Sequence, residues 1–364
     1  MHRFKGLTVS LMALLAPLAS ALASAQQSPP VKADSAPAAA VELQAVTVSG
    51  VQPGPGLWKV SRGEHVLWVL GTLGLLPEKM QWRAQEVQQH IGEAQQVLEV
   101  PTVGLNANVG FFGGLALLPS LIGVRNNPDG KKLRDVVPPA DYARWLPLKA
   151  EYIGHDNGVE KQRPIFAALA LYLAAIKQAE LSDKVIDPTI KSALKQAKLK
   201  PTPVQYMIEV NNPRALVKDF KSGQIEDLDC FDKTLAHLQG DLGVMRARAN
   251  AWAVGDLDQL RQLPMSDQMS TCQAAITESG IAYKLGITSL PAKIEDTWVT
   301  AASKALDANK VSFALLPMSH LLGPDNYLLR LQAHGDQVEL PDGLTPPDEA
   351  ATPAHAASAS PAAH

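Results

Sequence analysis

The 364-residue sequence lacks the short motifs that identify the common enzyme classes. It contains no HExxH zinc helix, no GxxxxGK[ST] phosphate loop, no GxSxG nucleophile elbow and no CxxC pair. Ser319 is next to His320 in the chain, but sequence neighbours do not face each other as members of a catalytic triad must. The Lys and Arg residues form no dense patch interleaved with aromatic side chains, which argues against a nucleic-acid partner.

Cysteine is scarce, with only Cys230 and Cys272 in the whole chain. In an oxidising compartment, an isolated pair in one domain predicts a single disulfide. That bond would close a loop of about 42 residues and stabilise the fold by about 3–4 kcal/mol. The alternative is a pair of buried thiols that never meet.

No uninterrupted apolar run reaches the length of a membrane span, about 20 residues. The first apolar run, near the N-terminus, has the form of a signal peptide. Arg3 and Lys5 precede an uncharged apolar stretch at 7–18, and small residues follow at 23–25. We therefore expect cleavage after Ala25. The alternative, an N-terminal membrane anchor, would need about 20 uninterrupted apolar residues. No cysteine follows the cleavage site, so a lipid-anchored form is not expected.

Both ends of the chain are poor in the residues that build a core. The segment 26–52 is rich in Ala, Pro, Ser and Val, and the tail 341–364 is of low complexity, so both are predicted to be disordered linkers. The remaining 53–340 is long enough for one large domain. Removing the signal peptide takes away two positive charges and changes the formal net charge from −3 to −5.

The start of this domain predicts a mixed α/β fold. Residues 58–60 and 65–70 read as a β-hairpin whose second strand is apolar enough to be central. Val87, Ile91, Ala94 and Leu98 have helical spacing, and a short strand at 96–100 follows. Strand, helix and strand in this order are typical of a parallel crossover, so we expect a mixed, mainly parallel central sheet with a large helical insertion.

The middle of the domain is predicted to be largely helical. Residues 164–176 form an apolar run that is too short to span a bilayer and favours a buried helix. Residues 104–124 carry no charge but include five Gly and a Pro, which favours a buried loop with a short helix; the alternative is an apolar cover over a cleft. A helix from Asp187 and a strand at 203–210 follow.

The C-terminal part of the domain has a clear order of elements. Residues 311–316 read as a strand, 317–323 as a turn, 324–333 as a helix beginning with Pro, and 337–340 as a closing strand.

Three polar residues fall at or just beyond the ends of predicted strands: Glu99, Glu209 and His320. In open α/β sheets, ligands bind outside the carboxyl ends of the strands. If these strands are parallel neighbours, the three side chains converge, and they can bind a divalent metal such as Mn or Mg or act as a general acid and base. The alternative is structural: a Glu at a strand end often caps a helix or pairs with an Arg, and a His in such a turn often satisfies backbone groups.

Six segments of the chain resemble, in order, those of the TraB/GumN family, part of a wider superfamily that includes the Tiki proteases. The resemblance covers roughly residues 55–340. The segments are GLWKV with VLWVLGT, QQVLEV, RPIFAALAL, VIDPTIKSALKQAKLKPTPVQYMIEV, ANAWAVGDLDQL, and SFALLPMSHLLGPDNYLLRLQAHGDQVE.

The resemblance implies a metal-dependent hydrolysis, with peptide bonds as the expected substrate and Mn, Co or Zn as the metal. It implies that Glu99, Glu209 and His320 are catalytic and that Glu99 and His320 hold the metal. The first family turn corresponds to Gly71, Thr72 and Gly74, the helix-opening acid to Asp187, and the end of the second turn region to Gly323, and these residues are implied to bind the ligand.

The sequence departs from the family pattern in both Gly-x-x-His turns. Gly74 stands where the family has the first histidine, and Pro317 stands where it has the second glycine. Glycine can neither ligate a metal nor move a proton, so two hypotheses follow. The favoured one is an exported envelope protein, periplasmic or secreted, that binds a peptide, an envelope polymer or a partner protein without catalysis. The other is a divergent metal-dependent hydrolase.

Overall fold

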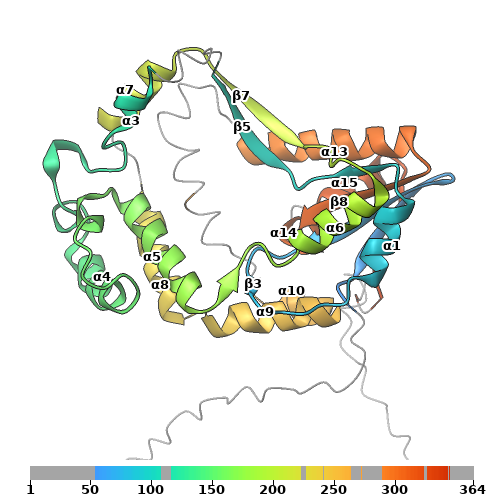
Figure 1. The fold of residues 1–364 in the computed structure, drawn as a ribbon, viewed down its shortest axis with the longest axis horizontal. Coiled ribbons are helices and arrows are strands. Elements are labelled where there is room, and N and C mark those ends of the chain that lie inside the picture. The colour runs from blue at the N-terminus through green and yellow to red at the C-terminus, as the bar shows by residue number, and fades with distance from the viewer. Residues whose placement is uncertain are drawn as a thin grey trace, which may run out of the picture. The chain divides into compact units, whose positions relative to one another are not determined.

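Figure 1 shows the fold of the chain as a computed structural model. It describes the following residues: 54–107, 116–222, 227–240, 242–263, 272, 289–323, 326–342 and 344. The predicted signal peptide 1–25, the linker 26–52 and the tail beyond residue 344 lie outside these ranges. Within the described ranges, no helix is both long enough and apolar enough to cross a bilayer.

A five-stranded mixed sheet forms the centre of the α/β domain, with the strand order β4-β8-β2-β1-β9. The strands are β1 (Leu57–Arg62), β2 (His65–Thr72), β4 (Gln96–Leu98), β8 (Val311–Pro317) and β9 (Gln337–Glu339). β8 is parallel to both β2 and β4, whereas β1 is antiparallel to both β2 and β9. Four of the five strands therefore run in one direction, which confirms the predicted mixed, mainly parallel sheet.

The sheet is stable because its strands and their covering helices share one apolar core. Leu67, Val69 and Leu70 of β2 are buried there, as the apolar composition of this strand predicted. The helix α13 (Leu290–Ala308) packs on β2 and β8 and buries Trp298 in the same core. α1 (Gln85–Glu93) adds Val87 and Ile91.

Two element boundaries differ from the sequence-based prediction. α1 ends at Glu93, so Leu98 belongs to β4 and not to the helix. The last helix, α15 (Tyr327–Ala333), starts three residues later than predicted. The Oδ1 atom of its N-cap Asn326 accepts a hydrogen bond from the Leu328 amide at 2.9 Å, and this cap sets the start of the helix. Pro324 lies outside the described residues.

The predicted helical insertion is present and has its own core. α4 (Pro139–Tyr152), α5 (Pro164–Gln178) and α8 (Leu228–Gly240) pack against one another. Trp145, Leu171 and Phe231 are buried between them. α5 confirms the helix predicted for residues 164–176.

A disulfide between Cys230 and Cys272 confirms the predicted pairing of the two cysteines. Cys230 lies in α8, and both cysteines belong to the core of the insertion.

Several shorter elements complete the described fold. α6 (Asp187–Ala197) packs on α1, and α9 (Leu242–Val254) packs on α10 (Leu257–Gln262). Two-residue strands β3 (Leu76–Pro77) and β6 (Leu181–Ser182) pair antiparallel. The short elements also include a four-residue helix α14 (Ser319–Leu322) and the 3-10 turns η1 (Pro128–Gly130), η2 (Leu133–Asp135) and η3 (Val159–Lys161).

A second pair of strands lies outside the five-stranded sheet. β5 (Thr102–Ala107) and β7 (Gln205–Val210) form a parallel two-stranded sheet of their own (Figure 1). The helix α3 (Leu118–Leu121) follows β5 in the chain and α7 (Pro213–Ser222) follows β7, and these two helices pack on each other.

The expected burial of residues 104–124 is wrong for their described part. Leu105 is 64% exposed, and Leu118, Leu121 and Ile122 are also exposed. The segment includes the strand β5 and the helix α3, and neither contains a buried residue. Residues 108–115 lie outside the described ranges.

Candidate functional site

The two turns that correspond to the family's Gly-x-x-His motifs lie side by side. β2 and β8 are parallel neighbours in register, with Thr72 opposite Pro317. The Thr72 carbonyl accepts a hydrogen bond from the Met318 amide at 2.8 Å. The first turn (71–74) and the second (317–320) therefore leave the same edge of the sheet at adjacent positions, as a shared site requires.

Gly71 is a glycine for a packing reason. A Cβ atom on Gly71 would lie 2.5 Å from the Cε atom of the buried Met318, so the Met318 side chain would have to move. The Gly71 carbonyl accepts a hydrogen bond from Nε1 of Trp252 at 2.7 Å. Gly71 thus leaves room for the Met318 side chain between the two turns. The buried Trp252 holds the first turn through its hydrogen bond to the Gly71 carbonyl.

Trp252 is a positioning residue to which the sequence analysis gave no role. The signal was present in the Trp-Ala-Val-Gly-Asp stretch at 252–256, but nothing in the sequence names the carbonyl that its indole contacts. Gly255 in this stretch has φ +72°, and a Cβ there would lie 2.7 Å from the Gly54 carbonyl oxygen. The Asp256 carboxylate caps α10 by accepting a hydrogen bond from the Gln259 amide at 3.0 Å.

Gly74 differs from Gly71 because the space around it is open. A Cβ atom on this exposed residue would meet no heavy atom within 4 Å. A larger side chain therefore fits at this position, and packing does not explain the glycine.

His320 lies in α14 and is held against an aromatic pair. Its ring stacks on Tyr327 with a centroid distance of 4.3 Å and an interplanar angle of 22°. Tyr327 in turn contacts Trp298 at 5.9 Å between ring centroids, and both of these aromatic side chains are buried. The imidazole is partly exposed, and the stacking restricts its orientation at the sheet edge.

Gly323, which closes α14, also has a structural explanation. A Cβ there would lie 2.3 Å from the Ser319 carbonyl oxygen, to which the Gly323 amide donates a hydrogen bond at 3.1 Å. Pro317 is the last residue of β8, and the carbonyl of Thr72 opposite it accepts a hydrogen bond from the next amide, that of Met318. Both residues shape the second turn.

Glu99 lies at the same edge of the sheet as the two turns. It directly follows β4, which is the other parallel neighbour of β8. Its amide donates a hydrogen bond to the Thr202 carbonyl at 3.0 Å, and its side chain is partly exposed. Glu99 and the two turns therefore leave the sheet from the ends of neighbouring parallel strands.

The structure does not bring Glu209 to that edge. Glu209 lies on β7 opposite Asn106, whose Nδ2 donates to both carboxylate oxygens at 2.9 and 3.0 Å. It is seven residues beyond Thr202, the residue next to Glu99, along a chain that is extended in β7. At about 3.3 Å per extended residue, this places Glu209 on the order of 20 Å from Glu99.

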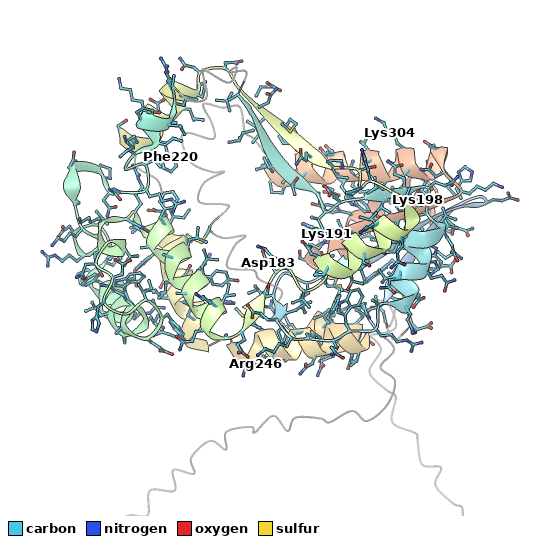
Figure 2. The ribbon with its side chains drawn as sticks, in the orientation of Figure 1. Asp183, Lys191, Lys198, Phe220, Arg246 and Lys304 are labelled. Atoms are coloured by element: carbon cyan, nitrogen blue, oxygen red, sulfur yellow. A yellow bond between two sulfur atoms is a disulfide. The ribbon has the colours of Figure 1, made fainter. Side chains whose placement is uncertain are left out.

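Asp187 is a surface residue at the start of α6. Its Oδ2 atom accepts a hydrogen bond from Nζ of Lys191 at 3.0 Å, and both side chains are exposed. Lys191 is labelled on α6 in Figure 2. Such an i,i+4 pair supports the helix by a few tenths of a kcal/mol, roughly 0.3–0.5.

The donor atoms at the sheet edge do not fit the metal site that the resemblance implies. Glu99 and His320 remain as donors, whereas Gly74 offers no side-chain donor and Glu209 lies elsewhere. Among the described residues, no group of three or more His, Cys, Asp and Glu side chains is placed to hold a metal ion. Structural and catalytic metal sites usually use three or four protein ligands.

Comparisons with known proteins identify the family. Neither a curated protein nor a solved structure matches the chain. The model of the TraB/PrgY/gumN family matches residues 56–340, which include every described strand of the central sheet and both turns. The chain therefore belongs to the TraB/PrgY/gumN family.

Proposed function

We propose that this protein is an exported member of its family that binds a ligand at the two adjacent turns and does not hydrolyse it. The observation that carries the proposal is Gly74. Its turn lies beside the turn of His320, and the space around it is open, so the position of the missing histidine is accessible but has no donor. For an exported protein of the cell envelope, the expected ligand is a peptide or an envelope polymer.

Export is supported by two independent features. The N-terminal sequence has the three parts of a signal peptide, with Arg3 and Lys5 before the apolar stretch and small residues at 23–25. The Cys230–Cys272 disulfide fits an oxidising compartment. Together they support a periplasmic or secreted protein.

Metal analysis of the purified mature chain tests the absence of catalysis. We expect less than stoichiometric Mn, Co or Zn after dialysis, and no turnover in a peptidase screen. Stoichiometric metal, with both metal and turnover lost in His320→Ala, would show instead a divergent metal-dependent hydrolase that uses Glu99 and His320 at the sheet edge.

Restoring the missing side chain tests the geometry of the site. Gly74→His should add a third donor beside Glu99 and His320 and raise the affinity for Zn or Co at least about tenfold, because each imidazole ligand contributes directly to metal binding. The matched control is Gly92→His on α1, where a Cβ also meets no heavy atom within 4 Å. Equal gains in both variants would mean that the two turns do not form one site.

A further inference from the structure

Three large apolar side chains are exposed at α3: two belong to the helix, and the third belongs to the residue that directly follows it. Leu118, Leu121 and Ile122 are 56%, 43% and 75% exposed. Their spacing of i, i+3 and i+4 places them on one side of a helical turn. We call these three residues the apolar tip. A group of large apolar side chains that is exposed together is typical of a surface that contacts a partner.

α7 carries three cations on one face beside the apolar tip. Arg214, Lys218 and Lys221 are spaced at i, i+4 and i+7, and all three line a hollow of about 510 Å³ that also includes Ser120 of α3. Asp129 is the carboxylate among the lining residues. We call the three cations the basic face.

The apolar tip and the basic face are joined by hydrogen bonds. Nζ of Lys221 donates to the carbonyl oxygens of Ser120 at 3.3 Å and of Ile122 at 2.8 Å. Neither Arg214 nor Lys218 forms an ion pair within the part of the chain that the structure describes. These two cations therefore remain available to an anionic partner.

The surface is also held firmly from behind. Phe220 of α7, labelled in Figure 2, lies 6.2 Å from the ring of Phe166 in α5. Nη2 of the buried Arg163 donates to the carbonyl oxygens of Phe220 at 2.7 Å and of Lys221 at 2.9 Å. The last turn of α7 is thus fixed to α5, which leaves its basic face turned toward the hollow.

We propose that the apolar tip and the basic face dock on the surface of an anionic lipid bilayer. Lipid phosphates contact Arg214 and Lys218, and the apolar tip enters the boundary between headgroups and acyl chains. Interfacial segments combine these two properties, and each Lys or Arg near an anionic bilayer adds about a fivefold gain in binding. The positive charge of the basic face argues against a second copy of this chain docking through the same surface, because two basic faces would repel. An acidic polymer is disfavoured because it would leave the apolar tip in water.

Vesicle sedimentation of the mature chain tests this proposal. We expect binding to vesicles of equal parts phosphatidylglycerol and phosphatidylcholine, weaker binding at high salt, and no binding to phosphatidylcholine alone. Ile122→Asp should weaken binding at least about tenfold, because it removes an apolar side chain that enters the bilayer. Lys218→Glu should weaken it at least about fivefold at low salt.

Matched variants away from this surface separate docking from general effects. Leu173→Asp changes an exposed leucine of α5, and Lys304→Glu reverses an exposed cation of α13, labelled in Figure 2. Both should bind vesicles like the unchanged chain. The proposal is wrong if the neutral vesicles bind equally well, or if all four variants behave alike. It is also wrong if the chain forms dimers that Ile122→Asp dissociates.

Discussion

The sheet core and the core of the helical insertion are built in different ways. The sheet core combines residues from opposite ends of the domain, such as Leu67 and Phe313, through the parallel pairing of β2 and β8. The insertion core combines helices that are closer in sequence and adds a disulfide. The sheet side is joined by backbone pairing and by an ion pair between Arg62 and the buried Asp336, whereas the insertion has a covalent link.

That ion pair joins the first hairpin to the start of β9. Arg62 Nε and Nη2 donate to the two carboxylate oxygens of Asp336 at 2.7 and 2.8 Å, and the Asp336 side chain is only 1% exposed. Arg62 also contacts Asp307 and Ser303 of α13. The carboxylates of Asp336 and Asp307 raise the pKa of the Arg62 guanidinium above its ordinary value. The comparison predicts that each region depends on its own link.

Loss of the disulfide should have the largest effect. Replacing Cys230 and Cys272 by Ser removes a link across 42 residues and should lower the free energy of unfolding by about 4 kcal/mol in the chain-entropy model. Thermal melting with and without reductant measures this change. Reductant should destabilise the unchanged chain by a similar amount and leave the double Ser variant unaffected. A variant as stable as the unchanged chain would show that the insertion core does not need its covalent link.

Loss of the buried ion pair should have the next largest effect. Arg62→Ala leaves the Asp336 carboxylate buried without its main partner and should cost about 3 kcal/mol in denaturant unfolding. The matched control on the same strand is Lys59→Ala, which removes the exposed pair with Glu339. That change should cost less than about 1 kcal/mol. Similar losses in both variants would contradict the importance given to burial.

The smallest effect is a change in how stability depends on pH. Burial raises the pKa of the Asp227 carboxyl, against the opposing effects of the Ile165 amide and the nearby Arg163. The native protein then binds this proton more tightly than the unfolded chain does. Stability is therefore greatest below the unfolded pKa and falls as pH rises through the higher folded pKa.

Asp227→Asn should remove this fall, because Asn keeps the oxygen that accepts from Ile165 but does not titrate. The difference is about 1.4 kcal/mol for each unit by which the two pKa values differ. Denaturant unfolding at several pH values from 3.5 upward measures it, and Asp229→Asn, an exposed residue of α8, is the control. Parallel pH profiles for the unchanged chain and Asp227→Asn would contradict the raised pKa.

Some elements could be predicted from the sequence because their signals are local. The hairpin of β1 and β2, the apolar helix α5 and the strand β8 each have a periodicity that few neighbours can override. The long helix α13 was not predicted, although it buries Trp298 against the sheet. Its local signals were present in the sequence, because Ser289 is the N-cap residue and a Pro lies in the first turn.

The site shows the same division. The order of the strands places Glu99, Thr72 and His320 at one edge, as the sequence suggested, because consecutive parallel strands end on the same side. Glu209 also follows a strand pattern, but its strand pairs with β5 and not with the central sheet. No periodicity records which strand will be the partner, since pairing depends on contacts between distant segments.

By itself, the sequence determined the class of the fold, the pairing of the only two cysteines and the glycine at the position of the missing histidine. The first two follow from composition and local periodicity, and the third follows from comparing single residues with the pattern of the family that the chain resembles. Only the tertiary structure decided that the space around Gly74 is open while that around Gly71 is filled by Met318. It also decided that Leu118, Leu121 and Ile122 are exposed beside a basic face. The physical reason is that burial belongs to the neighbours of a side chain, and those neighbours come from distant parts of the chain.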